Sequence, residues 1–138
     1  MTTALVELDD RFILPLSGAH VLRCCIGWGV TFLLRVDHGT YELRINGPFL
    51  LRVGSSEVRL VPEDDAQLLA PVLPLSRLEV LTAAALKDGS FDMEFSNGSA
   101  MSVMPDQRLE PWELSGPNGM LIVSTPGGEL SVWEPVKE

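Results

Sequence analysis

Basic residues are scarce in this chain. Its 138 residues, about the length of one domain, include ten Lys and Arg against nineteen Asp and Glu, which gives a formal charge of -9. Binding to nucleic acid regardless of its sequence requires clustered Lys and Arg that neutralise phosphates, and an anionic membrane surface attracts the same residues. We therefore expect neither nucleic acid nor a membrane among the partners of this chain.

Long apolar runs are also missing. Stretches such as residues 68–75 are short and contain Pro71 and Pro74, whereas a membrane-spanning helix needs about 20 apolar residues. The first ten residues lack the basic segment of a secretion signal, and an acid already appears at Glu7. These features predict a cytoplasmic protein.

Cysteine and histidine are represented by two residues each. Cys24 and Cys25 are adjacent, so on a strand they point to opposite faces, and we expect two reduced thiols with no disulfide between them. His20 and Cys24 share a strand face, but roughly 13 Å of extended chain separates them, which is too far for direct proton transfer. His38 falls in a turn, where we expect exposure to solvent.

Familiar catalytic motifs are absent from the sequence. It contains no G-x-S-x-G elbow, H-E-x-x-H, Walker loop or G-x-G-x-x-G following a strand. The acidic run at residues 63–65 follows Pro62, and we interpret it as a helix start because acids there complement the helix dipole. The sequence thus indicates no metal, no cofactor and no set of catalytic residues.

What the sequence does contain is a strong period of two. Apolar and polar residues alternate in three clear segments, residues 30–36, 40–46 and 90–96, as in strands with one buried and one wet face. Glycine-containing turns such as Asp88-Gly89 separate the segments, which favours hairpins. We predict about eleven or twelve strands and a mainly β fold, an antiparallel sandwich or flattened barrel.

The strands fall into two meander-like halves joined by one short helix. A weak internal repeat relates residues 20–61 to residues 78–134, and the expected helix lies near residues 62–70. Pro71 should end or kink this helix, because the residue before a proline is disfavoured in helical geometry. We expect the whole chain, residues 1–138, to form a single β-rich domain.

Several short segments stand out after about Val21: Gly47-Pro48-Phe49, Pro62-Glu63, Trp112-Glu113-Leu114 with Gly116-Pro117, and residues 126–133 (PGGELSVW). In these segments the sequence resembles a family of small uncharacterised β-rich domains common in high-GC Gram-positive bacteria, and the resemblance covers most of the chain from about Val21 onward. The resemblance implies no known activity and therefore no catalytic residues.

The net negative charge is confined to the second half of the sequence. Residues 1–60 contain six basic and six acidic residues, whereas residues 61–138 contain four and thirteen. If each half formed its own sheet, one face of the domain would be strongly negative. Trp133 adds an exposed aromatic anchor if Leu130 and Val132 face the core. The predicted binding residues are Asp92, Glu94, Glu113, Glu129 and Trp133.

Three functions fit these features. The leading one is a small cytosolic protein-binding module, immunity-like or regulatory, that uses an acidic face to attract a basic partner. The alternative is a β-barrel or sandwich that binds a small molecule, with weak hydrolytic activity in one version, which requires a pocket. The third is self-association through an edge strand such as residues 49–53.

Overall fold

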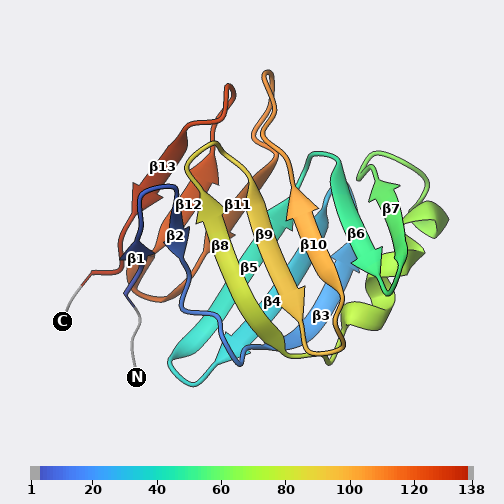
Figure 1. The fold of residues 1–138 in the computed structure, drawn as a ribbon, viewed down its shortest axis with the longest axis horizontal. Helices are drawn as coiled ribbons and strands as arrows, with labels where there is room; N and C mark the ends of the chain where they lie inside the picture. Colours follow the sequence, from blue (N-terminus) through green and yellow to red (C-terminus); the bar gives the residue numbers. More distant parts are fainter. Residues whose placement is uncertain (1–3, 137–138) are drawn as a thin grey trace.

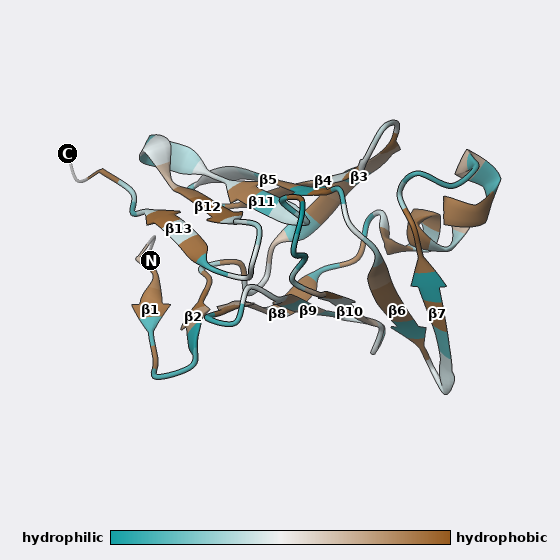
Figure 2. Ribbon diagram, turned by 90° about the horizontal axis from the view of Figure 1, so that it is seen from above, coloured by the Kyte–Doolittle hydropathy of each residue, from teal (hydrophilic) through white to brown (hydrophobic). Residues whose placement is uncertain are grey.

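The computed structural model describes residues 4–136, which form thirteen β-strands and two three-ten helices. The strands build two antiparallel sheets that lie face to face (Figure 1). Viewed from above, the sheets form the two layers of a sandwich that does not close into a barrel (Figure 2). The predicted mainly β sandwich is confirmed.

The first sheet has seven strands in the order β1-β2-β8-β9-β10-β6-β7. All its pairings are antiparallel. Its strands are β1 (Val6–Glu7), β2 (Arg11–Ile13), β6 (Phe49–Val53), β7 (Ser56–Leu60), β8 (Val80–Leu86), β9 (Phe91–Phe95) and β10 (Ala100–Val103).

The second sheet has six strands in the order β13-β12-β11-β5-β4-β3. It is also antiparallel throughout. Its strands are β3 (His20–Ile26), β4 (Val30–Val36), β5 (Gly39–Ile45), β11 (Trp112–Ser115), β12 (Leu121–Ser124) and β13 (Leu130–Trp133).

The core lies between the two sheets and is lined by the inward residues of the predicted alternation. This arrangement removes apolar surface from water, at about 25 cal/mol per Å². The polar residues between the inward positions face outward, so the predicted inner faces of these strands are confirmed. The buried positions include Phe32 and Leu34 on β4, Tyr41 and Leu43 on β5, and Phe91, Met93 and Phe95 on β9.

The two halves of the sequence are interleaved between the sheets. The meander β3–β5 belongs to the second sheet and the hairpin β6–β7 to the first, whereas β8–β10 belongs to the first and β11–β13 to the second. Each meander is followed by a proline, Pro48 or Pro105, which lacks the N–H needed to continue the ladder. The hypothesis that each half forms its own sheet is therefore wrong.

The helix between the halves, η1 (Ala66–Leu75), differs from the expectation for residues 62–70. It is a three-ten helix that continues through Pro71 and Pro74 instead of ending before them. A succession of short i to i+3 turns does not need an N–H donor at every position, so it accommodates both prolines. The acidic run precedes the helix, and buried side chains of η1 pack beside β3.

One end of the sandwich is held by two turns in backbone contact. Gly89, between β8 and β9, lies against Gly128, between β12 and β13, so closely that a Cβ on Gly89 would lie 2.6 Å from the Gly128 Cα. The Gly89 carbonyl accepts hydrogen bonds from Trp112 Nε1 at 2.9 Å and Ser124 Oγ at 2.7 Å. These contacts tie the first sheet to the second.

Candidate binding surface

The outer face of the first sheet carries a hollow of about 330 Å³. Its floor is β10, where the small side chains of Ala100 and Ser102 point outward between longer ones on β9 and β6. Because small residues on one strand are flanked by large residues on its neighbours, the sheet surface dips there. The lining residues are Leu50, Arg52, Glu57, Asp92, Met93, Glu94, Ala100, Met101 and Ser102.

Three carboxylates and one guanidinium line this hollow. In the strand register Glu94 lies opposite Ala100, which lies opposite Arg52, which in turn lies opposite Glu57. Asp92 lies opposite Ser102 and accepts a hydrogen bond of 2.6 Å from its hydroxyl. That bond orients the half-buried Asp92 carboxylate, whereas Glu57 and Glu94 are exposed. The hollow therefore has a local excess of negative charge.

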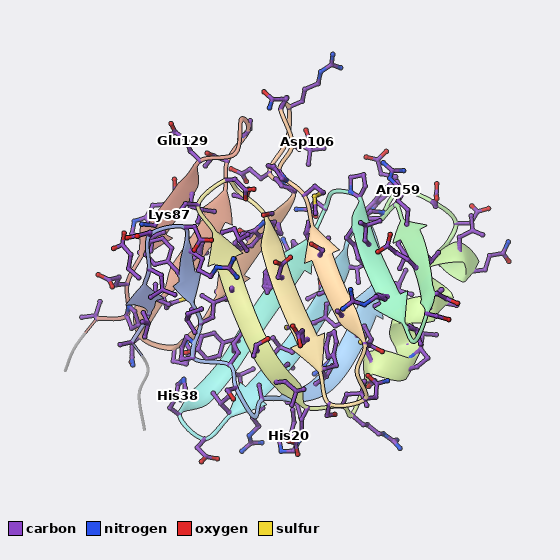
Figure 3. All side chains as sticks on the ribbon, in the orientation of Figure 1. His20, His38, Arg59, Lys87, Asp106 and Glu129 are labelled. Carbon is purple, nitrogen blue, oxygen red and sulfur yellow. The ribbon has the colours of Figure 1, made fainter. Side chains whose placement is uncertain are left out.

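The structure does not bring the five predicted binding residues together. Asp92 and Glu94 line the hollow. Glu113 lies on the second sheet, with its carboxylate 3.7 Å from the Arg44 guanidinium, and Glu129 lies in the turn between β12 and β13, at one end of the molecule (Figure 3). Trp133 is 53% exposed on the edge strand β13. A single acidic face containing all four acids is not formed.

Sequence reasoning missed three polar residues of the hollow. Arg52, Glu57 and Ser102 occupy alternate outward positions, which the period of two does indicate. Their position beside Asp92 and Glu94 depends on β6 pairing with β10, two strands far apart in the sequence. That pairing has no local signal, so alternation alone could not find the hollow.

Among the hydrogen bonds of residues 4–136, none joins a histidine to a cysteine. His38 was expected to be exposed, but it is half-buried, and its Nε2 lies 2.8 Å from the Tyr41 hydroxyl. Burial raises the pKa of Tyr41, so the phenol stays protonated and donates when Nε2 is the unprotonated ring nitrogen. His20 is exposed on β3. Within residues 4–136, no three His, Cys, Asp or Glu side chains are placed close enough together to hold a metal ion.

The adjacent cysteines differ sharply in environment. Cys24 is half-buried, its Sγ lies 3.6 Å from the Val72 carbonyl oxygen, and burial raises the pKa of its thiol to about 12. Cys25 is exposed. We expect iodoacetamide at about pH 8 to modify Cys25 at least about tenfold faster than Cys24 in the folded protein, because the thiolate is the reactive form. Peptide mapping by mass spectrometry measures both rates.

Unfolding in urea provides the control for this prediction, since both thiols should then react at similar rates. Equal rates in the folded protein would contradict the assigned environments.

In the described part of the chain, neither helix is long and apolar enough to cross a membrane.

Comparisons with known proteins place the chain in a family. Searches of the curated proteins and of the solved structures gave no match. The family model that does match covers residues 12–134, nearly all of the two sheets. The chain therefore belongs to the Family of unknown function (DUF6188).

Proposed function

We propose that this chain is a cytosolic protein-binding domain, immunity-like or regulatory in role, whose hollow on the first sheet receives a basic side chain of a partner. The observation that carries the proposal is the convergence of Glu57, Asp92 and Glu94 around a floor of small residues, with Arg52 as the one cation among the lining residues. A Lys or Arg side chain matches the charge of such a hollow.

The geometry of Asp92 supports this assignment. Ser102 donates to its Oδ1, which holds the carboxylate in place before a ligand arrives. Preorganised carboxylates lose less conformational entropy on binding than mobile ones. The formal charge of -9 adds long-range attraction for a basic partner, which makes the association rate dependent on salt.

An NMR titration tests the hollow directly. The probe is the tripeptide amide Gly-Lys-Gly or Gly-Arg-Gly, with Gly-Glu-Gly as the charge control. We expect shifts of backbone amides in β6, β7, β9 and β10, with a dissociation constant of about 1 mM or weaker, as befits a single side chain. Equal binding of the Glu peptide, or shifts confined to the second sheet, would refute the proposal.

A charge-removing variant makes the test quantitative. The double substitution Asp92→Asn and Glu94→Gln should weaken binding of the Lys peptide at least about tenfold, because both changes preserve shape but remove charge. The matched control is Glu113→Gln, which removes one carboxylate from the second sheet and should leave the affinity unchanged. Any protein captured from the native host should depend on the same two side chains.

A further inference from the structure

One edge of the first sheet is β7, at the end opposite the two-residue strand β1, and its backbone is unpaired on the outer side. The expectation that residues 49–53 form an edge is wrong, because β6 pairs with both β10 and β7. Ser56, Glu57, Val58 and Arg59 are all exposed, and Figure 3 shows Arg59 at this border of the molecule. By contrast, β3 of the second sheet is partly covered by hydrogen bonds to Arg77 and Leu78.

The turn before β7 determines which backbone groups point outward. Gly54 and Ser55 form a two-residue hairpin turn that joins the paired residues Val53 and Ser56, and Gly54 has a φ of 61°. Such a hairpin closes on a hydrogen-bonded pair, and such pairs then alternate along the ladder. Ser56, Val58 and Leu60 therefore bond to β6, whereas the N–H and C=O groups of Glu57 and Arg59 face away from it.

No described residue satisfies these outward groups. Within residues 4–136, no backbone hydrogen bond outside the sheet ladders involves Glu57 or Arg59. An exposed row of this kind is a template for pairing with another strand. The occupant must place hydrogen-bonding groups opposite these two residues and side chains of suitable charge beside them.

We propose that β7 pairs antiparallel with β7 of a second copy of this chain, about a two-fold axis at Val58. In this register Glu57 lies opposite Arg59 of the second copy, and Arg59 lies opposite its Glu57. Both are outward-bonding residues, so each pair makes two backbone hydrogen bonds. Val58, which is 38% exposed, meets its own symmetry mate at the axis in a closer, non-hydrogen-bonded pair.

The charges select both the partner and the register. Centring the pairing on Glu57 or on Arg59 would place like charges directly opposite each other, which is unfavourable. Of these three registers, only the one centred on Val58 is complementary. It places Glu57 of each copy opposite Arg59 of the other. The interface is small, so we expect a weak dimer with a dissociation constant on the order of 100 µM. It joins the first sheets of two copies into one continuous sheet.

Charge reversal tests the pairing by sedimentation velocity from about 10 µM to 1 mM. Arg59→Glu should weaken dimerisation at least about tenfold, since it places acids opposite each other. Adding Glu57→Arg to Arg59→Glu should restore the dimerisation affinity to within about threefold of the wild-type value. The control Arg35→Glu, an exposed change on the second sheet, should have no effect. A wild type that stays monomeric at 1 mM, or a dimer indifferent to Arg59→Glu, overturns the proposal.

A cysteine scan reads the register separately. A non-hydrogen-bonded antiparallel pair brings Cα atoms to about 4.5 Å, within the range of a disulfide. In a Cys25→Ser background, Val58→Cys should therefore oxidise to a covalent dimer. Glu57→Cys should not, because its mate in the second copy is offset along the strand; the reverse result would refute this register.

The dimer and the basic-ligand hollow share Glu57, but each is tested without the other. Sedimentation and oxidation are measured without peptide, and Asp92→Asn with Glu94→Gln should leave dimerisation unchanged.

Discussion

Replacing Trp112 by Ala should lower the free energy of unfolding by about 4 kcal/mol, since truncating a buried Trp removes its apolar contacts and leaves a cavity. Trp112 has no exposed surface, and its ring lies edge-on to Phe91 with the centroids 5.0 Å apart. Its Nε1 also donates to the Gly89 carbonyl. Single domains have a total stability of about 5–15 kcal/mol, so this one change threatens the fold. Urea denaturation followed by circular dichroism measures the loss.

Two other tryptophan variants separate the contributions to this loss. Trp112→Phe keeps most of the ring contact but loses the hydrogen bond, so we expect a loss of about 2 kcal/mol. Trp133→Ala removes a half-exposed ring from an edge strand and should lower stability by under about 1 kcal/mol. If Trp112→Ala lowered the free energy of unfolding by less than Trp133→Ala does, the assigned burial of Trp112 would be wrong.

Gly128→Ala should destabilise the protein by about 3 kcal/mol. Gly128 has a φ of 96°, which is strained for any residue with a side chain, and a Cβ there would lie 2.5 Å from the Asp88 carbonyl oxygen. The Asp88 oxygen is a backbone atom and the backbone also fixes the position of the added Cβ, so neither can rotate away. The two turns must separate, which loosens the contact between the sheets. The urea midpoint reports the change.

Gly127→Ala is the matched control for this prediction. Gly127 is the adjacent residue and has the same φ of 96°, but a Cβ added to it would have no contacting atom within 4 Å. Gly127→Ala should therefore lower the free energy of unfolding only through backbone strain, by about 1 kcal/mol. The difference between the two variants isolates the contact between the turns, and equal losses would mean that this contact contributes nothing.

The strands were predicted well because the alternation of apolar and polar residues that defines a strand lies within the strand's own sequence. The alternation at Phe91, Met93 and Phe95 defines an inner face regardless of which strand lies alongside. The same holds for the hairpin turns, whose glycines adopt positive φ at Gly89 and Gly98. The helix was misplaced because the three-ten geometry tolerates Pro71 and Pro74 inside it, whereas an α-helix does not.

The candidate site could be predicted only in part. Asp92 and Glu94 were identified from their outward positions on one strand, and they do lie together in the hollow. Glu113 was grouped with them because it belongs to the same half of the sequence, but the crossover after β10 carries it to the other sheet. Charge counted along a chain becomes charge on a face only when the strand order is known.

The interleaving of the two halves has a consequence for how the chain folds during synthesis. β5 can be paired on both sides only after β11 has left the ribosome, because Ile45 pairs with Trp112. In the same way, β6 can pair with β10 only after Val103, the partner of Phe49, has been synthesised. Non-local pairings of this kind raise contact order and slow folding. Until the last third of the chain emerges, the early meander therefore presents an open strand edge to its surroundings, and a truncated chain would keep that edge permanently.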